Sequence, residues 1–424
     1  MTTTTNNEQK KLNFSSEREQ SQACLNSAEH EKNQGRKVLN VPNLRFPEFQ
    51  GEWEEERLAD IADLYKGTGI SKDQLSDDGE PCILYGELYT KYKSETIREV
   101  ISKTNIDNTK LVRSKANDVI IPCSGETAED IATARCVLNG NILLGGDLNI
   151  IRLHGYDGAF MSYQLNGRRK YDIAKVAQGV SVVHLYGEHM KGVKTINPCL
   201  KEQKKIASLL ALLDERISTQ NKIIEDLKKL KSAIIEKLYK EIQGTWYSYR
   251  QLFSIINERN KQLEYSNVLS ASQERGMVSR EDLNLDIHFE RSNISTYKIV
   301  KNGDYVIHLR SFQGGFAFSE KTGICSPAYT VLRPHNLLVY GYLSNYFTSR
   351  DFVNSLIIVT YGIRDGRSIN VDEWLDMKVV IPSKEQQTHI VNVIESIENK
   401  IKNEETYSNC LLNQKQYLLR QMFI

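Results

Sequence analysis

KEQKKIASLLALLDERISTQNKIIEDLKKLKSAIIEKLYK, residues 201–240, is the stretch of sequence that decides the fold. Apolar residues recur in it at alternating steps of four and three, from Ile206 to Leu238. Eight of the ten positions in this series are apolar, and the exceptions are Gln220 and Lys231. A repeat of 3.5 residues is typical of a coiled-coil seam. The series therefore predicts a helix of about 40 residues, which is about 60 Å long at 1.5 Å per residue.

The same pattern returns near the end of the chain. Adding 184 to each position gives a second series from Ile390 to Met422, in which seven of ten positions are apolar. A lysine, Lys231 or Lys415, interrupts both series at the same place. A second long helix is therefore expected, and the chain of 424 residues contains an internal repeat.

Matching stretches upstream of each series show that more than the helix is repeated. The period of roughly 185–190 residues is too long for a solenoid, so each copy is expected to be a whole domain followed by a helix. The matching stretches are residues 51–53 (Gly-Glu-Trp) and 244–246 (Gly-Thr-Trp), 117–121 and 303–307, and 147–152 and 328–333.

A proline and a Lys-Glu-Gln motif connect each domain to its helix. The motifs at 201–203 and 384–386 align at an offset of 183, whereas the seams align at 184, so a slip of one residue is expected between them. Pro198 and Pro382 are expected to end the preceding strands, and Gly244 to end the first helix as its C′ residue.

Each long helix could pack on its own domain, or the two could pack on each other. The strict 3.5-residue spacing favours the second arrangement, as an antiparallel pair with Gln220 opposite Ser408. The predicted seam consists of Ile206, Leu210, Leu213, Ile217, Gln220, Ile224, Leu227, Ile234, Leu238, Ile390, Ile394, Ile397, Ile401, Ser408, Leu411, Leu418 and Met422.

The fold class predicted for the segments before each helix is α+β, because short β-rich runs alternate with helical pieces and loops. The expected strands are Pro81–Tyr85, Asp118–Pro122, Leu148–Leu153, Tyr305–Leu309, Tyr329–Arg333 and Lys378–Pro382, and the expected helical pieces are Ala159–Asn166 and Val339–Ser349. The expected organisation is a polar, mobile extension (1–42), a first domain (43–200), a central helix (201–243), a second domain (244–383) and a C-terminal helix (384–424).

Composition excludes several classes of protein. No apolar run approaches the roughly 18 residues of a membrane span, and residues 1–40 lack the apolar core of a secretory signal. The seven cysteines form no C-x-x-C, which favours reduced thiols in a cytoplasmic protein and no zinc site. The net charge of +1 indicates no basic tail for binding nucleic acid.

No motif for catalysis or for metal binding stands out. The chain contains no P-loop and no H-E-x-x-H, and Gly67 and Gly69 lack the third glycine of a dinucleotide-binding turn. Glu398 and Lys400 have no acidic partner suitably placed for a nuclease site, and His184 and His308 lie near serines without forming a recognisable triad. The sequence therefore predicts no catalytic residue and no metal ligand.

Residues 41–424 resemble the specificity subunit of type I restriction–modification systems. The resemblance rests on two α+β domains that each end in proline, Glu-Gln and a long heptad helix. The segments 42–49 (PNLRFPEF), 51–53, 85–90 (YGELYT) and 184–187 (HLYG) are also similar to that family. The forty-residue leader is a departure from it, because comparable members begin close to the Pro42 segment.

This resemblance implies a non-catalytic DNA reader. Its two target recognition domains would each bind half of a bipartite double-stranded sequence, and its paired helices would separate them and dock two methyltransferase subunits. The methyltransferases would bring AdoMet and part of the charge that neutralises phosphates, while motor–nuclease subunits would use ATP and Mg²⁺. Alternatives are a specificity subunit for a fused methyltransferase–nuclease, and a coiled-coil adaptor whose two domains bind proteins.

Within a DNA reader, Arg and Lys suit guanine edges, Asn and Gln suit adenine, and hydroxyls suit phosphates. Loops that carry such residues are therefore the candidate contacts. In the first domain these are Lys66, Thr68, Ser71, Lys72, Tyr89, Lys91, Ser124 and Thr127. In the second domain they are Arg259, Asn260, Lys261, Arg275, Arg310, Ser311, Gln313, Arg364 and Arg367.

Overall fold

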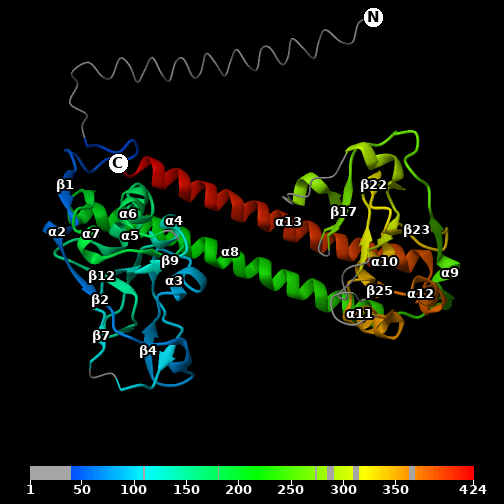
Figure 1. Ribbon diagram of the computed structural model, residues 1–424, viewed down its shortest axis with the longest axis horizontal. Helices are drawn as coiled ribbons and strands as arrows, with labels where there is room; N and C mark the ends of the chain where they lie inside the picture. Colours follow the sequence, from blue (N-terminus) through cyan, green and yellow to red (C-terminus); the bar gives the residue numbers. More distant parts are fainter. Residues whose placement is uncertain are drawn as a thin grey trace, which may run out of the picture. The chain divides into compact units, whose positions relative to one another are not determined.

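The computed structural model describes residues 40–107, 110–179, 181–272, 275–283, 291–308, 315–361 and 368–424. The chain folds as two compact units (Figure 1). The first unit runs up to Arg216 and also includes Leu411–Ile424, and the second unit is Ile217–Cys410. The first unit is therefore assembled from two segments that the whole of the second unit separates in sequence.

Two five-stranded sheets and a pair of short two-stranded sheets form the first unit. The strand orders are β2-β12-β8-β10-β5 and β3-β6-β4-β11-β7, with β1-β14 and β13-β9 as separate pairs. The strands are β1 Glu54–Arg57, β2 Ala62–Lys66, β3 Leu75–Ser76, β4 Glu80–Ile83, β5 Thr96–Ile97, β6 Lys103–Thr104, β7 Val112–Arg113, β8 Asp118–Pro122, β9 Ser124–Gly125, β10 Arg135–Val137, β11 Leu143–Leu144, β12 Leu148–Leu153, β13 Val183–His184 and β14 Lys194–Asn197.

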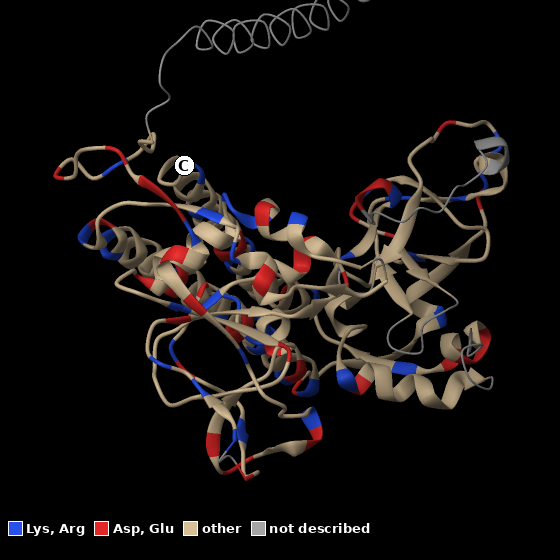
Figure 2. Ribbon diagram, turned by 60° about the vertical axis from the view of Figure 1, so that its left-hand side comes forward, with Lys and Arg blue, Asp and Glu red and all other residues tan. Residues whose placement is uncertain are grey.

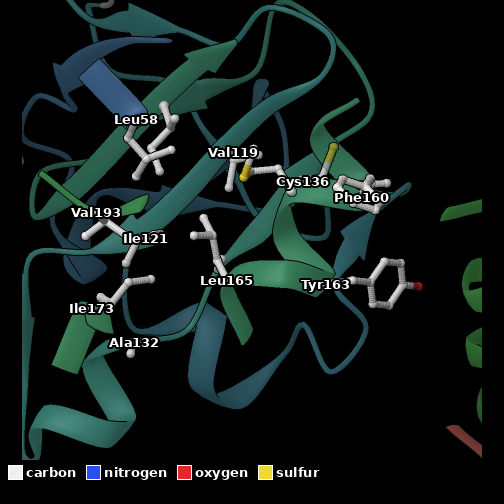
Figure 3. Close-up of a cluster of buried hydrophobic side chains, with 14 of the residues drawn as sticks. Leu58, Val119, Ile121, Ala132, Cys136, Phe160, Tyr163, Leu165, Ile173 and Val193 are labelled. Carbon is white, nitrogen blue, oxygen red and sulfur yellow. The ribbon is translucent and has the colours of Figure 1, made fainter. Parts of the chain in front are cut away.

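Short helices cover the sheet β2-β12-β8-β10-β5, which we call the larger sheet because its strands are longer, and close its core. Val119 and Ile121 lie on the same face of β8 and belong to one buried cluster with Phe160 and Leu165 of helix α5 (Figure 3). The helices are α2 Leu58–Ile61, α3 Glu87–Thr90, α4 Ala128–Ile131, α5 Gly158–Asn166, α6 Lys170–Val176 and α7 Gly187–Met190.

The second unit repeats the central part of this plan with fewer strands. A four-stranded sheet has the order β16-β23-β20-β21, and β15 pairs with β26 as β1 pairs with β14. The strands are β15 Thr245–Ser248, β16 Phe253–Ile256, β17 Leu269–Ser272, β18 Gly276–Ser279, β19 Lys298–Val300, β20 Tyr305–Ile307, β21 Phe316–Phe318, β22 Gly323–Cys325, β23 Thr330–Pro334, β24 Thr360–Tyr361, β25 Ser368–Ile369 and β26 Lys378–Ile381.

An aromatic core fills the second unit. Trp374 is fully buried, and its ring stacks on Tyr249 with centroids 4.3 Å apart. Phe316 and Phe347 pack around this pair, at 4.9 and 6.2 Å from the Trp374 ring. The helices that surround it are α9 Tyr249–Leu252, α10 Tyr342–Tyr346, α11 Arg350–Ser355 and α12 Val371–Asp376.

Equivalent ion pairs, each with a buried aspartate, show the duplication at the level of single atoms. Arg152 Nε and Nη2 lie 2.9 and 2.7 Å from the carboxylate oxygens of Asp118. Arg333 contacts Asp304 in the same bidentate way, at 2.9 and 2.8 Å. Each aspartate starts or directly precedes a central strand and each arginine lies on the neighbouring strand. The repeat predicted from the sequence is therefore present in the folded chain.

A buried glutamine joins each domain to the start of its long helix. Gln203 Nε2 donates to Pro198 O at 2.8 Å, and Gln387 Nε2 donates to Pro382 O at 3.0 Å. These glutamines are 184 residues apart, the same offset as the heptad seams. The predicted one-residue slip is therefore wrong, because the motif at 384–386 is not equivalent to 201–203.

The two long helices predicted from the heptads are confirmed, and so are the α+β class and the antiparallel pairing. They are α8 (Leu200–Lys240) and α13 (Lys384–Gln421). Within the second unit, Lys228 pairs with Glu405 at 2.7 Å and Lys231 with Glu398 at 2.6 Å, so the helices run in opposite directions.

The end of the first helix differs from the prediction. Helix α8 stops at Lys240, so Gly244 is not its C′ residue. A Cβ at Gly244 would lie 2.3 Å from Ile381 O, and glycine is required there by the close approach of β15 to β26.

Polar residues lie in the seam of the second unit, close to the predicted register. Gln220 donates to the Glu404 carboxylate at 2.5 Å, and Ser408 Oγ donates to Asn221 Oδ1 at 3.1 Å. Gln220 was expected opposite Ser408, and Ser408 bonds to Asn221, the next residue along the chain, while Gln220 bonds to Glu404, one turn before Ser408.

A buried ionic cluster joins the last turns of α13 to the first unit. Lys415 Nζ lies 2.5 Å from Glu95 Oε2 and 2.6 Å from Asp214 Oδ1. Asp214 also accepts hydrogen bonds from Tyr163 Oη at 2.7 Å and Ser94 Oγ at 3.0 Å. The lysine that interrupts the second heptad series is thus fully engaged with carboxylates.

Aromatic residues continue this attachment to the end of the chain. Phe423 is buried and stacks on Phe160, with ring centroids 5.1 Å apart and planes inclined by 27°. Trp53 meets the same Phe160 ring edge-on at 5.8 Å. Leu44 N donates to Gln421 O at 2.9 Å, so both ends of the described chain pack into the first unit.

Candidate nucleic-acid interface

Strand register brings most of the first-domain candidates to one end of the larger sheet. Lys66, the last residue of β2, pairs with Asn149 near the start of β12, and Pro122, the last of β8, pairs with Leu148. The loops that leave or enter these strands therefore lie together. We call residues 66–72, 123–127, 145–147 and 183–186 the first strand-end surface.

Glycines allow two loops of this surface to touch through their backbones. Gly67 N donates to Leu148 O at 2.8 Å, and Thr68 N donates to Leu144 O at 3.2 Å. A Cβ on Gly67 would lie 2.0 Å from Gly145 O, closer than any real contact. The loop after β2 is thus fixed against the loop before β12, so the side chains on both keep defined positions.

The substitution Gly67→Ala is expected to destabilise the first unit by about 1–3 kcal/mol, because a backbone oxygen cannot move aside cheaply. Gly69→Ala is the matched control, since a Cβ at Gly69 meets nothing within 4 Å. Urea unfolding of the full-length variants measures the difference. Equal midpoints for the two variants would contradict the close approach.

The candidate hydroxyl groups of this surface take part in local hydrogen bonds. Thr68 Oγ1 accepts from Val112 N at 3.1 Å, and Ser71 Oγ donates to Gln74 Oε1 at 3.0 Å. Thr127 caps helix α4 by accepting from Asp130 N at 3.0 Å. These residues shape the loops, and their hydroxyls are already partnered.

Two further candidates form hydrogen bonds within the first unit, although the Lys91 side chain is 36% exposed. Lys91 Nζ lies 2.7 Å from both Glu87 Oε1 and Ser102 Oγ, and Glu87 itself is buried. Tyr89 Oη donates to Ser124 O at 3.2 Å, and burial raises the pKa of this tyrosine above its ordinary value. Lys91 and Tyr89 are therefore engaged in contacts within the unit.

The first strand-end surface also contains residues outside the candidates predicted from the sequence. His184 Nδ1 lies 3.2 Å from Ser124 Oγ, because β13 pairs with β9. Tyr186 follows, leaves half of its area exposed, and lies with its ring centroid 6.2 Å from that of His184. In the sequence, the segment 184–187 is similar to a family motif, but strand pairing between residues 60 positions apart cannot be deduced from it.

Lys66 and Lys72 present exposed ammonium groups on this surface. The Lys66 side chain is 64% exposed and its Nζ lies 3.8 Å from Asp147 Oδ1. Asp147 is 48% exposed and has a left-handed backbone, with φ at 58°. Lys72 begins a short 3₁₀ helix and is exposed. These lysines therefore present charged groups to solvent on the first strand-end surface.

The second unit has an equivalent surface at the matching strand ends. Ile256 at the end of β16 pairs with Val331 of β23, and Ile307 at the end of β20 pairs with Thr330. We call residues 257–261, His308 and residues 326–329 the second strand-end surface. Both copies therefore present their candidate residues at corresponding positions of the fold.

Arg259 and Lys261 are exposed on the second surface, whereas Asn260 between them is buried. The Asn260 side chain donates to Tyr265 O at 2.7 Å and accepts from Tyr265 N at 3.2 Å, so its amide closes the loop and does not face outward. Arg275 is exposed elsewhere in the unit. The candidates Arg310, Ser311, Gln313, Arg364 and Arg367 lie outside the described residues.

Burial shifts two titratable groups beside the second surface. Desolvation lowers the pKa of Lys298, whose Nζ donates to Tyr329 O at 2.6 Å, and Arg259 lowers that pKa further. Burial also lowers the pKa of His308, whose ring lies 6.1 Å from that of Tyr329. A neutral imidazole is therefore favoured at the edge of this surface.

A hollow of about 750 Å³ in the second unit contains a serine–histidine pair. Ser254 Oγ lies 2.7 Å from His335 Nε2, and His335 Nδ1 lies 2.9 Å from Gln251 O. The corresponding residues of the first unit are Asp63 and His154, with Asp63 Oδ2 3.0 Å from His154 Nε2. We interpret the pair as a repeated feature of the fold.

Lys and Arg are interspersed with Asp and Glu over each unit (Figure 2). Among the described residues, no group of three or more His, Cys, Asp or Glu side chains is placed to hold a metal ion. In the same part of the chain, no helix combines the length and apolarity that crossing a membrane requires.

Comparison with known proteins adds the family context. The family model described as the type I restriction modification DNA specificity domain matches residues 50–229. The chain is 28% identical over 197 residues to the type I restriction enzyme MjaVIII specificity subunit of Methanocaldococcus jannaschii, covering 46% of this chain and 43% of that one. A putative MjaX specificity subunit of the same organism is 26% identical over 231 residues, 48% of this chain and 49% of that one. The chain thus spans about half the length of these relatives.

Solved structures share the fold. The S subunit of a type I restriction–modification system from M. genitalium aligns with a TM-score of 0.55 at 15% identity, over 91% of this chain and 99% of that one. A chain from a structure concerning complex assembly and conformational transition of the type I R-M system aligns with a TM-score of 0.55 at 14% identity, over 88% of this chain and 97% of that one. At these identities the likeness shows the fold alone.

Proposed function

We propose that the whole chain is the DNA sequence-specificity subunit of a type I restriction–modification complex, because residues 50–229 match the family model described as the type I restriction modification DNA specificity domain. The observation that carries the proposal is the repetition of one surface: loops bearing Lys66 and Lys72, or Arg259 and Lys261, leave matching strand ends in two copies of one fold. Two related readers in one chain suit a bipartite target.

In this proposal each unit reads one half-site of double-stranded DNA. Long helices of about 60 Å give a protein a stiff way to separate two readers, and half-sites on one face of DNA recur about every 34 Å. The chain itself performs no catalysis. Enzymes that modify a base must first extrude it, so recognition and chemistry can be divided between subunits.

The partners we propose are two methyltransferase subunits, which dock on the paired helices, and motor–nuclease subunits for cleavage. AdoMet, ATP and Mg²⁺ would be bound by those partners, and the complex would act in the cytoplasm. Large apolar side chains exposed on the long helices support docking, because such groups mark interaction surfaces. These side chains are Leu212, Ile223, Leu230, Tyr407, Leu412 and Tyr417.

The near-neutral charge also favours a reader that works with partners. Lys and Arg exceed Asp and Glu by one residue, and phosphate contacts supply most of the affinity of proteins for DNA. Bound methyltransferases would contribute the remaining positive charge. We therefore expect weak DNA binding by the isolated chain and strong, salt-dependent binding by the assembled complex.

Methylome sequencing tests the proposal. Cells that express the chain together with a type I modification subunit are expected to methylate one split motif, and cells with either protein alone are expected to show none. Methylation that does not depend on the chain, or no methylation from the pair, would contradict the proposal. A chain that binds the modification subunit but enriches no split motif from random duplexes would instead be a protein adaptor.

A further inference from the structure

The ion pair of Lys66 and Asp147 differs from the other polar groups of the first strand-end surface. The hydroxyls of Thr68, Ser71 and Thr127 already have hydrogen-bond partners within the unit, at 3.0–3.1 Å. The Lys66 Nζ to Asp147 Oδ1 distance is 3.8 Å, too long for a hydrogen bond. A donor and an acceptor therefore stand side by side with hydrogen-bonding capacity left for a ligand.

The backbones that carry these side chains are fixed. Lys66 is held by the pairing of β2 with β12, and Asp147 O accepts from Cys123 N at 2.7 Å. Gly67 and Gly145 are in direct backbone contact between them. The pair can therefore present its two charges in a defined orientation, as sequence reading requires.

Asp147 argues for contact with a base. A carboxylate repels phosphate, so it would weaken a surface that only followed the DNA backbone. Its φ of 58° is uncommon for a residue with a side chain, and such conformations concentrate at functional sites. The position follows two glycines, and another glycine would adopt this conformation without strain.

The chemistry of the pair matches one kind of base pair. In the major groove, guanine presents the acceptors O6 and N7, and cytosine presents the N4 amino donor. Guanine O6 and cytosine N4 are neighbours, because they are hydrogen-bonded to each other. We propose that Lys66 donates to guanine and Asp147 accepts from cytosine, so that the two residues read one G·C pair in the half-site of the first unit.

This inference rests on the proposed function, and one experiment separates the two. The full chain is mixed with a type I modification subunit and random-sequence duplexes, and the bound DNA is sequenced. The variants are Lys66→Gln and Asp147→Asn, because asparagine tolerates the left-handed backbone. The control is Lys194→Gln. Lys194 is an exposed lysine on β14 of the same unit, and its Nζ lies 2.6 Å from Glu55 Oε1.

We expect the unmodified chain to select a split motif with a G·C pair at one position of one half-site. Each variant should reduce the preference at that position by about tenfold and leave the other half-site unchanged, and the control should change nothing. A split motif that both variants leave intact, or a uniform loss of binding to all sequences, would overturn the inference and leave the proposed function standing. Selection of no split motif by the unmodified chain would overturn both.

Discussion

The substitution Lys415→Ala is expected to lower the free energy of unfolding of the first unit by about 3–5 kcal/mol at pH 7.5. The ammonium group lies between Glu95 and Asp214, and all three side chains are at most 14% exposed. Without the lysine, two carboxylates would remain in a poorly solvated place with no partner of opposite charge at hydrogen-bond distance. The effect is measured by denaturant unfolding, with hydrogen exchange in peptides of the first unit as the readout.

The repeat provides a matched control for this prediction. Lys231 occupies the equivalent heptad position and pairs with Glu398, but these side chains are 26% and 45% exposed. Water therefore solvates the pair, and Lys231→Ala should cost no more than about 1 kcal/mol. If both lysine variants lost the same small amount, the Lys415 cluster could not be the desolvated anchor inferred from the structure.

The pH dependence gives an independent check. The pKa of Glu95 is raised above its ordinary value because the carboxyl group is buried, and the positive charge of Lys415 offsets part of this increase. Removing Lys415 should raise the pKa of Glu95 further, so the folded variant binds a proton that the unfolded chain releases. A raised carboxyl pKa makes stability increase as the pH falls toward the ordinary pKa. The deficit of Lys415→Ala should therefore be smaller at pH 5.5 than at pH 7.5.

The second large effect is expected from Phe423→Ala, which should cost the first unit about 3–5 kcal/mol. The ring is 2% exposed and stacks on Phe160, beside Trp53, so its removal leaves a cavity in the core. Hydrogen exchange of the amides in α5 (Gly158–Asn166) should accelerate in the variant.

Tyr417→Ala is the control for the Phe423 prediction, because it also removes an aromatic ring near the end of α13. Tyr417 is 57% exposed, and loss of such a ring should change the stability by no more than about 0.5 kcal/mol. Unchanged exchange in α5 after Phe423→Ala would mean that the end of the chain is not part of this core.

Periodic and buried elements were predictable from the sequence, because their side chains follow one regular rule. The strands Asp118–Pro122 and Leu148–Leu153 have the predicted bounds, and both long helices begin within one residue of the prediction. The motif alignment failed because Lys-Glu-Gln at 384–386 matched the letters of 201–203, whereas the buried role belongs to Gln203 and Gln387.

The details of the candidate site were less predictable, because they depend on contacts between distant residues. Residue type suggested Asn260 as an adenine reader, but the folded loop uses its amide internally. The juxtapositions of Lys66 with Asp147 and of Ser124 with His184 span 81 and 60 residues. Such pairs are set by strand register, which local sequence patterns do not contain.

The position of Phe423 in the first core has a consequence for the order of events during synthesis. Ribosomes make about 5–20 residues per second, and the domain synthesised first usually folds first. Phe160 is made 263 residues before Phe423. The earliest part of this chain must therefore wait roughly 10–50 s for its last aromatic partner. During that interval an unfilled apolar site invites chaperone binding, so the second unit is expected to mature before the first.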